Sequence, residues 1–143
     1  MSFVRLGRRV ALPGHVRAAL AGLFGSDVDK VEIIEHSLFA RLHLRAVATT
    51  RRRRIFLRDG AEDFFENPSL MLHEYCHVLK QWEPGTMTVA RYLGECLRRG
   101  YWDNRFEIEA REFAEDNVYR FRALLSRSPQ QSFASIQASG KQR

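Results

Sequence analysis

The stretch His73-Glu74-Tyr75-Cys76-His77 decides how this chain is to be interpreted, because it matches the pattern His-Glu-x-x-His. On an α-helix, residues four apart differ by about 40° of rotation, so both imidazoles leave the same face and can bind one metal ion. Glu74 lies beside that face, where its carboxylate can deprotonate a metal-activated water. The stretch therefore predicts a zinc hydrolase site, with His73 and His77 as metal ligands and Glu74 as general base.

The flanking residues predict a helix from about Pro68 to Trp82. Asn67 suits the N-cap position, Pro68 suits the first helical position, and Pro84-Gly85 ends the helix. Apolar residues surround much of the helix circumference, which is typical of a buried helix. They are Leu70, Leu72, Tyr75, Cys76, Val78, Leu79 and Trp82.

A zinc ion needs at least three protein ligands, so a third ligand must come from outside the motif. No histidine follows His77, and the upstream His15, His36 and His43 have no motif spacing. A carboxylate from residues 104–114 is the favoured donor. This segment opens a long helix expected from about Asn104 to Ser126, and its periodicity does not choose between Glu107 and Glu109.

Beyond the motif, several segments resemble the metallopeptidase domain found in extracellular contractile injection system proteins and toxin-associated bacterial proteins. The resemblance covers roughly residues 10 to 122. The pattern Glu-x-Glu-Ala-x-x-Phe-Ala at 107–114 is similar to that of gluzincin-type metalloproteins. The other matching segments are Leu12–Arg17, Asp29–Ile34, Ala48–Thr50 with Arg54–Leu57, and Tyr101–Ala110.

This resemblance implies a zincin-like fold, a Zn²⁺ cofactor, a peptide or protein substrate, and a protein partner in a secretion or toxin system. In gluzincin-type sites the Glu just before Ala completes the zinc site. On that basis Glu109 is the first choice for the third ligand and Glu107 the second. The resemblance does not imply a particular substrate.

The expected architecture is α+β: an N-terminal helix, a small three-stranded, mostly antiparallel sheet, the active-site helix and two further helices. Residues 1–126 form a single domain, and residues 127–143, rich in Ser, Gln, Gly and Ala, are expected to be a disordered tail. The expected helices outside the motif are 13–24, 86–99 and 104–126, and the expected strands are Val31–Glu35, Phe39–Val47 and Arg53–Arg58.

Composition limits the class of protein. The chain of 143 residues has a formal net charge of +6 and no apolar run long enough to span a membrane. The N-terminus lacks the apolar core of a signal peptide, so a cytoplasmic location is expected. Cys76 and Cys96 do not form a disulfide framework, and Cys76 is expected to pack as a small hydrophobe. The run Arg51–Arg54 is interpreted as a solvated edge strand, and nucleic-acid binding is not expected.

The sequence therefore predicts a zinc-dependent metallopeptidase in which the strand at 53–58 lies along the cleft and pairs with an extended substrate. Tyr92, Tyr101 and His36 are candidates, by residue type alone, for stabilising the oxyanion. The alternative is a catalytically silent, zinc-stabilised binding or adaptor domain. Glu74 favours the enzyme, because a purely structural zinc site needs no general base.

Overall fold

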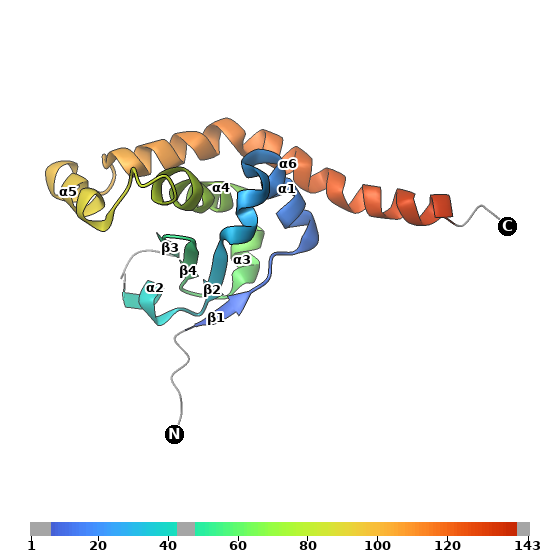
Figure 1. The fold of residues 1–143 in the computed structure, drawn as a ribbon, viewed down its shortest axis with the longest axis horizontal. Helices are drawn as coiled ribbons and strands as arrows, with labels where there is room; N and C mark the ends of the chain where they lie inside the picture. Colours follow the sequence, from blue (N-terminus) through green and yellow to red (C-terminus); the bar gives the residue numbers. More distant parts are fainter. Residues whose placement is uncertain (1–6, 43–47, 140–143) are drawn as a thin grey trace, which may run out of the picture.

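The structure, a computed structural model, describes the backbone of residues 7–42 and 48–139 and the side chains of residues 7–40 and 48–127. Within these ranges a small sheet is flanked by helices (Figure 1). The strands are β1 (Arg8–Val10), β2 (Glu32–Glu35), β3 (Ala48–Arg51) and β4 (Arg54–Leu57). The helices are α1 (Gly14–Phe24), α2 (Leu38–Leu42), α3 (Ala61–Phe65), α4 (Pro68–Cys76), α5 (Val89–Arg99) and α6 (Arg105–Ser139), with a 3₁₀-helix η1 (Gly25–Lys30) and a π-helix η2 (His77–Trp82).

The sheet has the strand order β1-β2-β4-β3. The central pair, β2 and β4, is parallel, with Ile33 opposite Ile55. The outer strands are antiparallel to their neighbours: β1 pairs with β2, and β3 pairs with β4. Within the described ranges, β3 therefore keeps one edge without a strand partner.

The expected sheet of three strands is corrected to four. The strands expected at Val31–Glu35 and Arg53–Arg58 correspond to β2 and β4, whereas β1 and β3 were not expected. The strand expected at Phe39–Val47 is wrong over its first four residues, which lie in α2, and residues 43–47 lie outside the described ranges. The alternating apolar pattern of this segment is short, and a local helix cap overrides it. The Ala40 amide donates to Ser37 Oγ at 3.4 Å and starts a helical turn.

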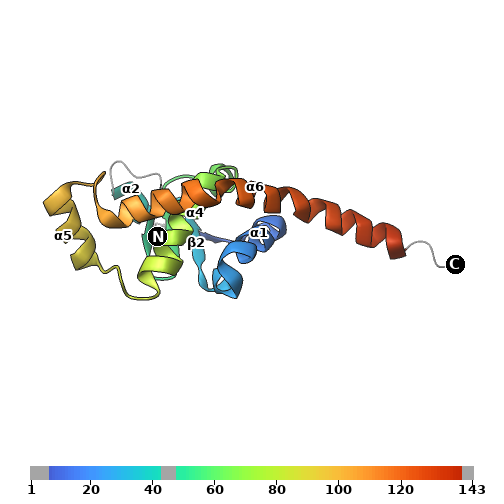
Figure 2. The same ribbon diagram turned by 90° about the horizontal axis from the view of Figure 1, so that it is seen from above.

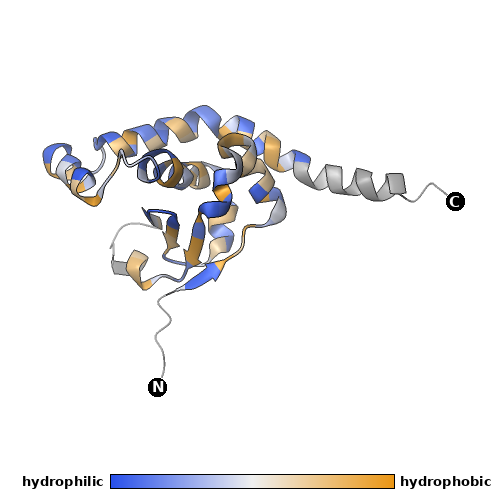
Figure 3. Ribbon diagram, in the orientation of Figure 1, coloured by the Kyte–Doolittle hydropathy of each residue, from blue (hydrophilic) through white to orange (hydrophobic). Residues whose placement is uncertain are grey.

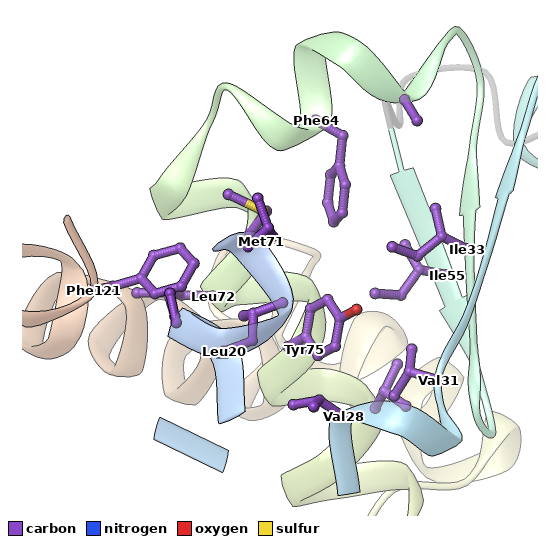
Figure 4. Packing of buried hydrophobic residues seen from close by; sticks show 14 of the residues in the cluster. Leu20, Val28, Val31, Ile33, Ile55, Phe64, Met71, Leu72, Tyr75 and Phe121 are labelled. Atoms are coloured by element: carbon purple, nitrogen blue, oxygen red, sulfur yellow. The ribbon is translucent and has the colours of Figure 1, made fainter. Parts of the chain in front are cut away.

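The hydrophobic core lies between one face of the sheet and the helices. Figure 4 shows Ile33 and Ile55 of the sheet facing Tyr75 of α4, with Leu20 of α1 and Phe121 of α6 behind it. All five side chains are fully buried or nearly so. Seen from above, α6 crosses over α4 and lies beside α1 (Figure 2). Hydrophilic residues follow the outer side of α6 (Figure 3), so this helix forms the outer layer.

The helix predictions are confirmed for the elements now called α1 and α5, and α4 begins at Pro68 as expected. The side chain of Asn67 accepts a hydrogen bond from the Leu70 amide at 3.1 Å, which confirms the predicted N-cap. The expected single helix to Trp82 is continuous, but from His77 it is a π-helix. The last helix reaches Ser139 rather than Ser126, and the disordered tail stays a prediction. None of the helices in the described ranges has the length and apolarity needed to cross a membrane.

Candidate metal centre

The helix formed by α4 and η2 places the two motif histidines together. His73 lies in the last turn of α4 and His77 opens η2. Their rings meet edge to face with centroids 4.7 Å apart, and their Nε2 atoms are 3.1 Å apart. The predicted convergence of the two imidazoles on one point is therefore confirmed.

The acidic member of the group comes from the first turn of α6. Glu107 Oε2 lies 3.0 Å from His73 Nε2 and 3.4 Å from His77 Nε2, and the Glu107 side chain is buried. Glu109, the first choice of the sequence analysis, is exposed, because two residues farther along a helix turn it about 200° away. The geometry thus brings Glu107 to the histidines and leaves Glu109 outside.

The three side chains could hold one metal ion. His73, His77 and Glu107 each offer a ligand atom, and these atoms lie within 4.8 Å of one another. Tetrahedral zinc with bonds of 2.0–2.2 Å requires ligand atoms about 3.3 Å apart. The nearest separations here, from 3.0 to 3.4 Å, agree with that value. Two imidazole nitrogens and one carboxylate are also a donor set that suits zinc, so the residues present fit the ion that the motif implies.

Gln81 fixes the orientation and the tautomer of His77. Its amide nitrogen donates to the Phe106 carbonyl oxygen at 2.9 Å, so its Oε1 points at His77 Nδ1, 2.6 Å away. Oε1 can only accept, and His77 Nδ1 must therefore carry the proton. The Nε2 lone pair is then left free for a metal, which is the arrangement by which a neighbouring group prepares a histidine ligand.

Glu107 is oriented in the same way by Tyr92 of α5. The Tyr92 hydroxyl donates to Glu107 Oε1 at 2.8 Å, which turns Oε2 toward the histidines. Burial alone would raise the pKa of Glu107, but its interactions with the two nearby histidines and with the Tyr92 hydroxyl lower it well below its ordinary value. Glu107 is therefore ionised at neutral pH, as a metal ligand must be.

Glu74 lies in the same cleft as the histidines and is only 7% exposed. Burial raises the pKa of its carboxyl group, and the neighbouring His77 and His73 oppose that shift. A carboxylate with a raised pKa in a water-accessible cleft has the properties of a general base or acid. This position agrees with the role that the motif predicts for Glu74.

The remaining candidates from the sequence lie in different surroundings. Cys76 is fully buried, and burial raises the pKa of its thiol to about 12, so it packs as a neutral side chain. Tyr101 lines the cleft, whereas the exposed His36 is not among the residues that line it. Tyr92 also lines the cleft, but its hydroxyl proton is directed to Glu107.

The cleft has a volume of about 620 Å³, which is within the range of ligand sites. One wall is β3, and the other includes Val89 and Leu93 of α5. The strand expected along the cleft was 53–58, but β4 is covered on both edges, by β2 and β3. The strand that borders the cleft is therefore β3.

Sequence reasoning missed Gln81 and the role of Tyr92. Gln81 had a readable signal, since it follows His77 by four residues and so shares its helix face. The sequence carries no comparable signal for Tyr92, because its contact with Glu107 connects two different helices and depends on the tertiary fold.

Comparisons with known proteins place the first part of the chain in a family. The model of the eCIS core domain, named for the extracellular contractile injection system, matches residues 11–85, which is more than half of the chain. The matched range includes His73, Glu74 and His77 and ends before Glu107. No curated protein and no solved structure matches the chain. The zincin-like fold therefore stays a prediction.

Proposed function

The chain belongs to the eCIS core domain family, and we propose that its function there is to hydrolyse peptide bonds as a zinc-dependent metallopeptidase. The observation that carries this proposal is the convergence of His73, His77 and Glu107 in a cleft that also contains Glu74. A binding module would need the three ligands but not a buried carboxylate beside them.

In this proposal, His73, His77 and Glu107 hold the ion. Zinc bound there supplies Lewis-acid activation of a water molecule and of the peptide carbonyl. Glu74 accepts the proton of the attacking water and returns it to the leaving amine. Gln81 and Tyr92 keep two of the ligands in position throughout. Burial of its hydroxyl end, together with the nearby Glu107 carboxylate, raises the pKa of Tyr101 to about 12. Tyr101 therefore remains a hydroxyl donor at neutral pH and is the candidate for contacting the oxyanion.

The edge of β3 gives the cleft a place for an extended peptide. All four residues of β3 line the cleft, and within the described ranges this strand pairs on one edge only. A peptide that adds to the free edge would form main-chain hydrogen bonds and run past the histidines. The apolar wall formed by Val89, Leu93 and Met87 favours substrates with large apolar side chains.

One observation favours the second candidate, a zinc-stabilised adaptor for a protein partner in a secretion system. On α5, Val89, Leu93 and Leu97 follow one another at intervals of four residues, and Leu97 is 89% exposed. Trp102 beyond the helix is also exposed. An exposed apolar stripe of this kind is typical of protein contact surfaces.

Turnover at equal zinc content separates the two candidates. Wild type and Glu74→Gln, each loaded with one zinc ion, are compared on casein and on peptide mixtures analysed by mass spectrometry. The metallopeptidase proposal expects Glu74→Gln to lower the rate about 10²–10⁴-fold. Equal rates, including none from either protein, would favour the adaptor.

The metal site is tested with two variants that lie two residues apart on α6 and make the same change. Glu107→Gln should weaken zinc binding by more than about 100-fold, because it removes a ligand. Glu109→Gln should bind zinc as the wild type does, because that side chain is exposed. Zinc content after dialysis and competition with a chromophoric chelator measure both. The reverse result would move the third ligand to Glu109.

A further inference from the structure

Arg51 differs from the other arginines of the run Arg51–Arg54. The other three have acidic partners, Glu83 or Glu32, at 2.8 to 3.9 Å. Arg51 has no carboxylate partner among the residues that the structure describes. It is also the member of the run that lines the cleft.

The Arg51 guanidinium is held in place without being neutralised. Its Nη1 donates to the Thr50 carbonyl oxygen at 2.9 Å. Its Cζ lies 4.7 Å from the centre of the Phe39 ring and 5.9 Å from that of Trp82. The Trp82 indole is itself fixed, since it donates to Thr50 Oγ1 at 3.1 Å. Cation–π contacts of this kind orient a guanidinium but satisfy none of its N–H groups.

Among the residues that the structure describes, four of the five N–H donors of Arg51 thus have no hydrogen-bond partner and can serve a ligand. The side chain is half-buried, and desolvation by burial lowers its pKa, although it stays charged at neutral pH. A partly desolvated guanidinium attracts a carboxylate more strongly than one in open solvent, because the local dielectric constant is lower. Two of its parallel N–H groups can engage both carboxylate oxygens. Arg51 also ends β3, so it lies at one end of a peptide bound along that edge.

We propose that Arg51 is a specificity-determining residue that binds a carboxylate of the peptide in the cleft. This inference rests on the proposed function, because it takes a peptide to be the occupant. The carboxylate belongs either to the C-terminus of the peptide or to an Asp or Glu side chain. The cleft would therefore select peptides that carry an anionic group at a fixed distance from the histidines.

Two pairs of peptides, measured by fluorescence anisotropy, test this assignment. The first pair is a labelled apolar pentapeptide made as the free acid and as the C-terminal amide. The second pair, both amidated, carries Glu or Gln at the central position. Binding is measured on Glu74→Gln protein to prevent cleavage, once with zinc and once with a chelator.

The expected result is that the anionic member of at least one pair binds 10-fold or more tightly than its neutral partner. Adding Arg51→Gln should remove this preference. The matched control Arg52→Gln, which deletes the same charge next to the cleft, should retain it. Arg51→Lys keeps the positive charge but lacks the paired N–H donors of the guanidinium, so it should retain part of the preference. This variant keeps the proposal testable if Arg51→Gln does not fold.

A preference in the first pair assigns the C-terminal carboxylate, and one in the second pair assigns an acidic side chain. The proposal is overturned if neither anionic peptide is preferred, if neither binds, or if the preference survives Arg51→Gln. Failure of the proposed function gives a different result: protein with Glu74 intact would hydrolyse nothing, while the charge preference in the binding assay would persist.

Discussion

The hydrogen bond between Gln81 and His77 gives a prediction about metal affinity. Gln81 is 1% exposed and joins His77 Nδ1 to the Phe106 carbonyl oxygen at the start of α6. Gln81→Met keeps the volume and the flexible stem but removes both hydrogen bonds. His77 would then be free to rotate and to place its proton on Nε2, the atom that faces the other ligands.

Loss of such a supporting group costs about 10–100-fold in metal affinity. Converted to free energy, this is about 1.4–2.7 kcal/mol of zinc binding. Gln81→Met also leaves the buried Nδ1–H group without a partner and removes one bond to the Phe106 carbonyl oxygen, so the free energy of unfolding of the metal-free protein should fall by about 1–3 kcal/mol. Gln81→Glu retains the acceptor toward His77 and should keep most of the zinc affinity while losing the bond to Phe106.

Competition with a chromophoric chelator measures the zinc affinity, and urea unfolding measures the stability. Asn117→Leu is the matched control, since it also replaces a carboxamide by an apolar group. The Asn117 amide donates to the Phe113 carbonyl oxygen on the same helix, away from the histidines. Zinc affinity within twofold of wild type for Gln81→Met would refute the reasoning that this amide prepares His77 as a ligand.

Three further predictions concern stability and are measured by denaturant unfolding. The buried Tyr75 hydroxyl has no hydrogen-bond partner among the described residues, so Tyr75→Phe should raise the free energy of unfolding by about 1 kcal/mol; a loss would show an unrecognised bond. Phe121→Ala should lower it by about 3–5 kcal/mol, because the ring is fully buried, and a cost below 1 kcal/mol would mean that α6 is not anchored there. Glu35 accepts a bond from the Ala61 amide at 2.8 Å, and this bond, opposed by burial and aided by Arg8, lowers its pKa. Above about pH 5, the free energy of unfolding of the wild type should therefore exceed that of Glu35→Gln by about 1.5–3 kcal/mol. This difference should disappear as the pH falls through the lowered pKa of Glu35, and a constant difference down to pH 2 would contradict the prediction.

The local parts of the site could be predicted from the sequence. The motif, its helix and the cap at Asn67 all depend on residues within a few positions of one another. For that reason helical geometry alone was enough to bring His73 and His77 together. The role of Glu74 stays a prediction, although its burial in the cleft is consistent with it.

The choice between Glu107 and Glu109 needed long-range information. Glu107, Ala114 and Phe121 are seven residues apart and share the buried face of α6. The periodicity of the sequence did not choose between the two glutamates, because each lies at a border of the apolar stripe expected on this helix. The family resemblance then favoured Glu109, whose side chain the fold directs to solvent.

The sheet was harder to predict than the helices. The strand β3 reads Ala-Thr-Thr-Arg, which has no apolar alternation, and its buried residue is the polar Thr50. Its partner β4 supplies the buried apolar side chains of that pair. The strand β1 has two arginines among three residues and is held by pairing with β2. Such edge strands are defined by the neighbour that they join, and a pattern within the segment does not reveal them.

Because η2 is a π-helix, the number of residues in the turn after His77 matters as much as their identity. The Glu83 amide bonds to the Val78 carbonyl oxygen five residues back, at 2.9 Å, so this turn holds one residue more than an α-helix would. Deleting the exposed Lys80 would let ordinary α-helical bonding replace this wide turn, because the deletion removes the additional residue. Gln81 would then follow His77 by three residues instead of four, and its amide would be displaced from His77 Nδ1. A single missing codon here would thus weaken the support of one metal ligand, even though the side chain that it removes is exposed.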